Sequence, residues 1–304
     1  MEQIAIDSVN IHDETCCISY PLEDGFLTDS IERYGIVSPL ILLDTSPRTV
    51  VTGFRRLRAA LRLGLRDVPC VLTCMNGREA LVTAIMDNVM RRLNLVEIAH
   101  SVQKMTGLGF AAGEIEQLTG FVGGSSAARA IALLIAVANG EDAAKRFIVE
   151  RGLPLGTVEY LFMLDDGERG QVLAALTRLR PTVSLIRDIL RLLLLVRLRT
   201  GFMPLQPLQE AGDADNLRRD LKGIAEPALS ELTRQLGDLR AGATIPPAID
   251  VRIDPFFERD YVDVSIRVRD ERDLDGALST LTGLSKSGFF RSMLDLVRGS
   301  RRGN

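Results

Sequence analysis

The sequence contains no tryptophan and only four tyrosines among its 304 residues. Proteins that bind single-stranded nucleic acid stack unpaired bases on aromatic side chains, so this composition argues against a single-strand binder. Long apolar runs are also missing. The most apolar stretches, 130–138 and 192–196, fall far short of the roughly 18–20 residues that cross a bilayer. We therefore expect no membrane contact.

An excess of positive charge is absent as well. The formal net charge is −3 and the isoelectric point is near 5.6, which argues against strong nonspecific affinity for DNA or anionic lipid. The N-terminal segment lacks the basic and apolar regions of a secretory signal, so a cytoplasmic location with reduced cysteines is expected.

The four cysteines form no C-x-x-C pair, and their spacing does not favour a zinc site. Cys70 and Cys74 lie at an expected strand, where a buried cysteine is ordinary. His100 lies among apolar residues of an expected helix, which favours a packed or surface histidine over a catalytic one. No constellation supports a nucleophilic cysteine or serine.

The composition, with 46% hydrophobic and 25% charged residues, is typical of a globular protein, and the length suits two or three domains. The hydrophobic pattern predicts an α+β chain with a small α/β N-terminal domain (1–95), a helical middle domain (96–205), and a linker followed by a small α+β C-terminal domain (206–304). The stretch 203–215, rich in proline and glycine, is the expected linker.

Within the first domain we expect a helix over 26–34, strands over 40–43, 49–52 and 68–73, and a helix that begins after Gly53 and ends near Gly64. The C-terminal domain should hold a helical stretch over 217–239 interrupted at Pro227. Strands over 249–253 and 261–268 around a turn at 255–260 should follow, and then helices over 274–284 and 289–297.

The segment TVVTGFRRL places a glycine between a strand and a helix whose first turn carries Arg55 and Arg56. A helix N-terminus offers unpaired N–H groups and a positive dipole end, and Gly53 allows a close approach to an anion. With two guanidinium groups added, the segment predicts a phosphate cradle. Taken alone, the same pattern is equally typical of an ordinary helix start with surface arginines.

A second segment, DNVMRRL, places Asp87 and Arg91 one helical turn apart with Asn88 beside them. Asp and Asn oxygens suit a hydrated Mg²⁺ on a nucleotide, and Arg91 would reach phosphate oxygens. Taken alone, an Asp–Arg pair is more often a surface salt bridge. The two segments together favour a nucleotide site.

About the first hundred residues resemble the N-terminal domain of ParB partition proteins. Three segments carry the resemblance in their order and spacing: LTDSIERYGIVSPLILLD, VVTGFRRLRAALRLG and DNVMRRLNLVEIA. The resemblance implies that the chain binds CTP with Mg²⁺ and acts as a nucleotide-dependent switch or clamp in DNA partition or related DNA metabolism. The nucleotide-binding residues implied are Gly53, Arg55, Arg56, Asn88 and Arg91, with Gly35 and Ser38 at the base or sugar. The metal-binding residues implied are Asp87 and Asn88.

Two positions depart from the family pattern. Phe54 stands where the family has an acidic residue, and Asp87 is one methylene shorter than the usual Glu. Arginine contacts to a triphosphate survive such changes better than metal placement does, so we expect binding to be kept better than hydrolysis. Whether the chain is an enzyme, a weak CTPase, is left open.

The resemblance also implies a helix-turn-helix over 114–138 that reads double-stranded DNA. However, Arg129 is the only basic residue between Met105 and Ala144, whereas a reading helix needs Arg, Lys, Asn or Gln at base edges and phosphates. We expect a degenerate helix-turn-helix that packs in the bundle or in a partner interface, so that any DNA contact is weak or indirect.

The C-terminal region resembles the ParB dimerisation module more loosely, which implies a homodimer; an independent small domain explains the pattern equally well. Two other functions use the same fold. A small-molecule kinase stays open, and so does a non-catalytic interaction adaptor that has lost nucleotide use. A sulfiredoxin is disfavoured because its phosphate turn needs a cysteine, which 54–56 lack.

Overall fold

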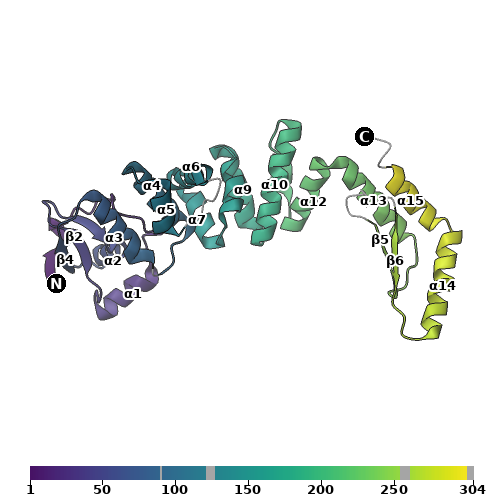
Figure 1. Cartoon of the computed structure of the whole chain (residues 1–304), viewed down its shortest axis with the longest axis horizontal. Coiled ribbons are helices and arrows are strands. Elements are labelled where there is room, and N and C mark those ends of the chain that lie inside the picture. Colours follow the sequence, from purple (N-terminus) through teal and green to yellow (C-terminus); the bar gives the residue numbers. More distant parts are fainter. Residues whose placement is uncertain (90, 121–126, 254–260, 300–304) are drawn as a thin grey trace. The chain divides into compact units, whose positions relative to one another are not determined.

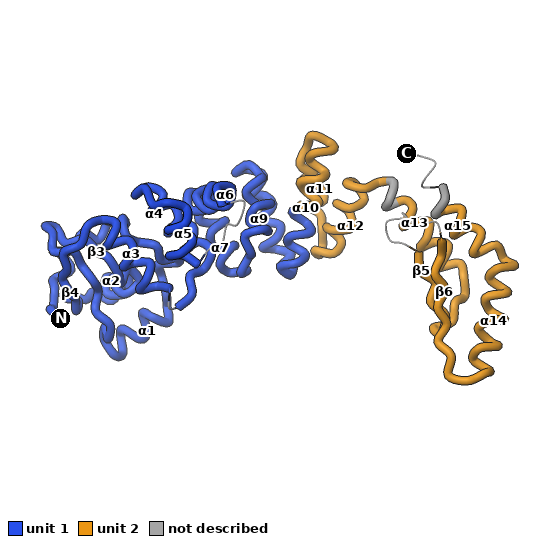
Figure 2. Tube along the Cα trace, viewed as in Figure 1, with its two compact units in different colours: residues 1–190 blue, residues 191–304 orange. Residues whose placement is uncertain are grey.

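The computed structural model describes residues 1–89, 91–120, 127–253 and 261–299. The chain divides into two compact units, residues 1–190 and 191–304 (Figure 2). The described residues contain many helices and two small sheets, which confirms the predicted α+β class. The predicted three-domain division, with boundaries near 95 and 205, stays a prediction.

The first unit begins with a four-stranded sheet and three helices (Figure 1). In chain order these elements are β1 (Glu2–Ala5), α1 (Gly25–Tyr34), β2 (Leu40–Leu43), β3 (Thr49–Thr52), α2 (Phe54–Arg62), β4 (Asp67–Thr73) and α3 (Gly77–Val89). The strand order is β1-β4-β2-β3; β2 runs parallel to β4, and the other two pairs are antiparallel. The strands and helices expected from the sequence are present. β1 is an additional strand that was not predicted; one of its four residues is buried, so its hydrophobic pattern is weak.

The core of this sheet consists of side chains that alternate along the strands. Leu40 and Leu42 of β2 are fully buried, as are Val68 and Cys70 of β4. Residue pairs such as Leu40 and Cys70 lie at the same level in the parallel register. Leu57 and Ala60 of α2 pack against this layer, so the helix has one fixed position over the sheet.

Gly53 joins β3 to α2 in a conformation that few other residues adopt. Its φ angle is +99°, in the left-handed region, and a Cβ atom at this position would lie 2.8 Å from Cγ of Leu40. The glycine therefore allows the strand to turn directly into the helix, and it sets where the first turn of α2 begins.

The rest of the first unit is helical. It contains α4 (Leu95–Gly107), α5 (Ala112–Thr119), α6 (Ala127–Asn139), α7 (Asp142–Arg151), α8 (Leu155–Phe162), α9 (Asp166–Leu179) and the start of α10 (Val183–Thr200). α6 packs against α4, with Leu134 and Val137 buried. Two helices thus lie where the helix-turn-helix was predicted, but most of its expected turn, residues 121–126, lies outside the described residues.

The second unit contains α11 (Leu205–Glu210), α12 (Ala214–Ala225), α13 (Pro227–Ala241), β5 (Ile249–Arg252), β6 (Asp263–Ile266), α14 (Glu271–Lys286) and α15 (Phe289–Gly299). Pro227 begins α13 rather than interrupting a helix, as its missing N–H allows. α11 lies within the segment expected to be a linker. The expected turn at 255–260 lies outside the described residues.

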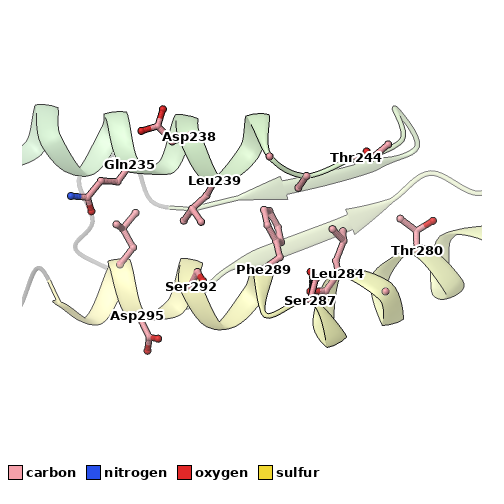
Figure 3. A pocket seen from close by; sticks show the side chains of 14 residues that line it. Gln235, Asp238, Leu239, Thr244, Thr280, Leu284, Ser287, Phe289, Ser292 and Asp295 are labelled. Carbon is pink, nitrogen blue, oxygen red and sulfur yellow. Dashed lines mark hydrogen bonds between the residues drawn. The ribbon is translucent and has the colours of Figure 1, made fainter.

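An open groove of about 1150 Å³ runs between α13 and the α14–α15 pair. Figure 3 shows Leu239 on α13 and Leu284 and Phe289 on the opposite side. Behind the groove, β5 and β6 form an antiparallel pair whose Ile249 and Val251 belong to the core of this unit. Across the described residues of both units, we find no helix with the length and apolar character needed to span a membrane.

We predict that Gly53→Ala lowers the free energy of unfolding by about 1–3 kcal/mol, since alanine would be strained at this φ angle and would press on Leu40. Urea denaturation followed by circular dichroism measures the change. Gly25→Ala is the matched control, because Gly25 has an ordinary φ angle and open space around it. Equal stability of the Gly53 and Gly25 variants would contradict the assignment.

Candidate functional site

A cavity of about 300 Å³ lies where α2 begins, beside the C-terminal end of α3 and the segment that leads into α1. Its volume is at the lower end for ligand sites, enough for a polyphosphate chain with part of a nucleoside. The cavity brings together both segments singled out in the sequence. The residues that line it are Ser19, Asp24, Leu27, Gly53, Phe54, Arg55, Arg56, Asp87, Asn88 and Arg91.

The first turn of α2 faces this cavity. The N–H of Leu57 is the first to bond within the helix, to the carbonyl of Gly53, so the N–H groups of residues 54–56 precede the helical ladder. A helix start of this kind carries partial positive charge. The local geometry predicted for an anion cradle is therefore present.

Arg56 connects the cavity to the turn after α1. Its Nη1 donates to the carbonyls of Ser38 and Pro39, both at 2.6 Å, and its Nη2 lies 3.6 Å from Oδ2 of Asp87. Burial lowers the pKa of this guanidinium, and Asp87 acts in the opposite direction. Arginine nevertheless stays charged at neutral pH.

Ser38 and Gly35 were predicted to lie at the base or sugar. The backbone carbonyl of Ser38 accepts a hydrogen bond from Arg56, and Ser38 itself is exposed. Gly35 ends α1 with a φ angle of +72° and does not line the cavity. The turn over 35–39 is thus attached to the rim of the site.

Glu97 is the residue that the sequence reasoning missed. Its carboxylate is fully buried, and it accepts from Nη2 of Arg55 at 3.1 Å and from Nη2 and Nη1 of Arg91 at 2.5 and 2.9 Å. The backbone N–H groups of Tyr20 and Asn94 complete the set at 3.1 Å each. A buried carboxylate needs partners of this kind, because desolvation of an unpaired charge is very costly.

The sequence signal for Glu97 was partial. Asn94 and Glu97 have the spacing of a capping box, and the structure confirms it: the Asn94 side chain accepts from the N–H groups of Val96 and Glu97, and Glu97 accepts from Asn94. The capping box accounts for one of the five donors on Glu97. Two more come from Arg91, six residues before Glu97, and the other two come from Arg55 and Tyr20, which only the tertiary fold brings close.

Asn88 and Asp87 differ in what they offer. Oδ1 of Asn88 accepts from Nε and Nη2 of Arg91 at 3.0 and 2.8 Å, so this oxygen is already engaged. Asp87 lines the cavity with its side chain 43% exposed and makes one long ion pair, to Arg56. Within the described residues, no group of three or more His, Cys, Asp and Glu side chains is placed to hold a metal ion.

These donors fit one kind of metal site. Mg²⁺ usually keeps several waters and binds through one or two carboxylates together with phosphate oxygens of the substrate. Asp87 suits that arrangement as a protein carboxylate beside a metal carried on a phosphate chain, whereas the other carboxylate of the lining, Asp24, already accepts from the N–H of Leu27 as the N-cap of α1. A cage made only of protein ligands does not fit the residues present.

Arg55 has the most unused hydrogen-bonding capacity. Its Nη2 is bonded to Glu97 and to the carbonyl of Tyr20, whereas its buried Nε finds no partner among the described residues. Burial lowers the pKa of this guanidinium, and repulsion from Arg91 lowers it further. A buried donor without a partner is unusual in a folded protein. Among the described residues, Nε of Arg48 and the hydroxyls of Thr52 and Thr157 are in the same state, and of these four residues Arg55 lines the cavity.

Phe54 has a packing role. It lines the cavity and packs against two clusters of buried residues, one containing Leu40 and the other containing Val51 and Ala84. A carboxylate at this position would be set against apolar side chains. The departure from the family pattern at this position therefore has a structural reason.

Tyr20 links the cavity to the helical region. Its N–H donates to Glu97, its carbonyl accepts from Arg55 and from Asn94, and its hydroxyl donates to Oδ1 of Asp142 at 2.7 Å. Burial raises the pKa of the phenol, and the bond to Asp142 raises it further. The ring also packs edge-on against His100.

His100 and the cysteines lie apart from this chemistry. Nδ1 of His100 lies 3.3 Å from the carbonyl of Ile18, and burial lowers the pKa of the imidazole. The thiols of Cys17 and Cys70 are buried, which raises the pKa of each to about 11. Thiols with raised pKa values are poor nucleophiles at neutral pH.

Comparison with known proteins gives a family match over part of the chain. Residues 25–89 match the sequence model described as the ParB N-terminal domain. The match contains the cavity residues from Leu27 to Asn88, whereas Arg91 and Glu97 follow it.

Relatives along the chain agree with this match. A "Probable chromosome-partitioning protein ParB" of Vibrio cholerae is 23% identical over 64% of this chain and 62% of its own length. The "Chromosome-partitioning protein Spo0J" of Thermus thermophilus is 34% identical over 47% of this chain and 52% of its own length. The chain thus spans between half and two thirds of these curated relatives.

Two solved structures of a C-terminally truncated ParB from Caulobacter crescentus are also similar. The complex with CTP-gamma-S is 25% identical, with a TM-score of 0.27, over 56% of this chain and 97% of that one. The complex with the centromeric parS site is 19% identical, with a TM-score of 0.31, over 63% and 99%.

We predict that Tyr20→Phe lowers the free energy of unfolding by about 0.5–1.5 kcal/mol near neutral pH, because it removes the bond to Asp142. The phenol has a raised pKa in the folded chain, so its contribution is complete below the ordinary value of 10.0 and is lost as the pH rises above it. The difference in the free energy of unfolding between the unchanged protein and Tyr20→Phe should therefore shrink as the pH rises above 10.0.

Denaturant titrations across this pH range measure both effects. Tyr34→Phe is the control, since Tyr34 is 76% exposed. A gap that stays constant into the alkaline range would show that the phenol makes no such bond.

Proposed function

Because the chain is a ParB-like protein with a ParB N-terminal domain over residues 25–89, we propose that it binds a nucleoside triphosphate, with CTP expected, in the cavity at the start of α2. Its curated relatives are chromosome-partitioning proteins. On this proposal the nucleotide acts as a switch or clamp signal in DNA partition or related DNA metabolism.

One observation carries the proposal: Arg55, Arg56 and Arg91, from two separate segments, line the same small cavity together with the first turn of α2. Guanidinium groups and helix N-termini are the donors that proteins use most often for phosphate. The unpartnered Nε of Arg55 adds a donor that a phosphate oxygen would satisfy.

The proposed residue roles follow from these positions. Arg55, Arg56 and the N–H groups after Gly53 would bind phosphate oxygens, and Arg91 would orient Asn88 at the edge of the cavity. Asp87 would hold a Mg²⁺ ion that arrives with the nucleotide, where the metal neutralises phosphate charge. The turn over 35–39 would lie near the base or sugar, as the bond from Arg56 to Ser38 suggests.

Hydrolysis is proposed to be weaker than binding. Phe54 contributes packing and no carboxylate, so Asp87 is the one acidic side chain at the end of α3 that lines the cavity. A lost or shortened carboxylate disturbs the positions of water and metal. It has less effect on the attraction between phosphate and arginine. A small-molecule kinase or an adaptor without nucleotide use remains the alternative.

We predict that Arg55→Ala lowers the affinity for CTP with Mg²⁺ by at least about a hundredfold, because it removes a charge-assisted contact from the lining of the cavity. Isothermal titration calorimetry with CTP, ATP and GTP measures this loss and the nucleotide preference together. Preference for ATP with product formation would favour the kinase, and absence of heat with all three would favour the adaptor.

Arg58→Ala is the matched control for that experiment. Arg58 lies on the same helix, is 45% exposed in its side chain and pairs with Glu14 away from the cavity. Its replacement should leave nucleotide affinity within about twofold of the unchanged protein, as expected for a surface charge. Equal losses in both variants would contradict a specific cradle.

For double-stranded DNA we predict weak binding with a shallow salt dependence, with a slope of log K against log salt of roughly −3 or less in magnitude. The one basic residue of α6, Arg129, forms an ion pair with Glu159 of α8. Gel shifts with random and genomic fragments at several salt concentrations measure the slope.

Arg129→Ala should leave that slope unchanged, because its side chain already has a partner within the unit. A steep slope, or a fragment bound selectively at physiological salt, would instead support a reading helix in this region.

The resemblance to the ParB dimerisation module leads us to propose a homodimer formed through the second unit. Analytical ultracentrifugation measures this oligomeric state.

A further inference from the structure

The carboxylate of Glu97 is held in the way that a protein holds a phosphate group. Nη1 and Nη2 of Arg91 approach its two oxygens side by side, and Arg55 reaches Oε1. Backbone N–H groups of Tyr20 and Asn94 supply the remaining contacts. Paired guanidinium donors with backbone N–H groups are the usual surroundings of a bound phosphate or carboxylate.

This internal anion takes up much of the capacity of the two arginines. Arg91 uses Nη1 and Nη2 on Glu97, and it uses Nε and Nη2 on Asn88. Arg55 shares Nη2 between Glu97 and the carbonyl of Tyr20. An incoming anion therefore meets an Arg55 with capacity left and an Arg91 that is nearly saturated.

The charges around the cavity are close to balanced for the same reason. The guanidinium groups of Arg55, Arg56 and Arg91 stand against the carboxylates of Asp24 and Asp87 in the lining, with Glu97 behind it. A fixed negative charge repels a ligand in proportion to the charge that the ligand carries. A Mg²⁺ ion on a polyphosphate cancels two negative charges and so reduces that repulsion.

We propose that Glu97 is a built-in counter-anion that decides which anions this cavity accepts. By neutralising Arg91 and part of Arg55, it disfavours metal-free polyphosphates relative to polyphosphates that arrive with a bound divalent cation. The inference deepens the proposed nucleotide site and rests on it. It makes Glu97 a specificity residue that acts through the arginines rather than by touching the ligand.

The test uses the full chain and tripolyphosphate as the probe, titrated by calorimetry with Mg²⁺ and with a chelator. Glu97→Gln keeps the size of the side chain and removes its charge. We expect the affinity for metal-free tripolyphosphate to rise at least about tenfold, and the dependence on Mg²⁺ to shrink by a similar factor. Unchanged or weaker binding of metal-free tripolyphosphate by a folded variant would overturn the proposal.

Glu114→Gln is the matched control. Glu114 of α5 likewise accepts from the backbone N–H of the N-cap residue of its helix, Ala111, and it pairs with an arginine, Arg78, away from the cavity. A purely structural role for Glu97 predicts that both variants only lose stability. A gain in anion affinity confined to the Glu97 variant separates the two explanations.

A second measurement covers the case in which Glu97→Gln does not fold. In the unchanged chain labelled with carbon-13 at glutamate carboxyls, the resonance of Glu97 is identified by its loss in Glu97→Asp. Tripolyphosphate with Mg²⁺ should shift this resonance while that of Glu114 stays in place. A Glu97 resonance that does not move at saturation would overturn the proposal.

The outcomes also separate this inference from the proposed function. If the unchanged chain binds CTP with Mg²⁺ but Glu97→Gln does not bind metal-free tripolyphosphate more tightly, the proposed role of Glu97 is wrong and the nucleotide site stands. If the variant binds metal-free tripolyphosphate more tightly but the unchanged chain binds no nucleotide, Glu97 still acts as a counter-anion and the proposed nucleotide function is wrong.

Discussion

The buried ion pairs of Glu97 with Arg55 and Arg91 are the constraint on which the arrangement of the site depends. A carboxylate without solvent contact is tolerated only while its partners remain in place. Those partners come from α2, from the residues after α3 and from the segment around Tyr20, so a single charge ties three parts of the chain together. The cavity is therefore shaped before any ligand arrives, which reduces the ordering that binding requires.

This arrangement affects what the site can do. Arginines that are already paired attract anions less strongly than free ones, and the charge-assisted contacts left over are concentrated at Arg55 and the start of α2. A cavity of this kind selects by geometry and by the net charge of the ligand more than by attraction alone. Phe54, at a position where the family has an acidic residue, packs against the apolar core and adds no further carboxylate to the cavity.

Much of the local design was predictable from the sequence. Gly53 with Arg55 and Arg56 is read from a strand, a glycine and a helix. Asp87 and Asn88 lie in the last turn of α3, but the prediction that Arg91 follows on the same helix is wrong, because α3 ends at Val89 and Arg91 lies in the turn after it. The fold still places these residues around one cavity. Glu97 and Tyr20 were not predicted as part of the site, because the bonds that place them there join distant residues: Arg55 and Glu97 are 42 residues apart, Tyr20 and Glu97 are 77 apart, and Tyr20 and Asp142 are 122 apart. Periodicity and capping rules describe contacts within a few residues, and long-range pairs need the tertiary fold.

Tyr20 shows how far the influence of the site extends within the first unit. The same residue contacts Glu97 through its N–H and Asp142 of α7 through its hydroxyl. Tyr20 thus connects the buried carboxylate to the start of α7 by two hydrogen bonds.

The central claim is that one polyphosphate lies between the start of α2 and the arginines that surround Glu97. A crystal structure of the chain with a non-hydrolysable CTP analogue and Mg²⁺ tests it most directly. The account predicts phosphate oxygens within hydrogen-bonding distance of the first N–H groups of α2 and of Nε of Arg55. Phosphates bound elsewhere, with Nε of Arg55 still lacking a partner, would contradict it.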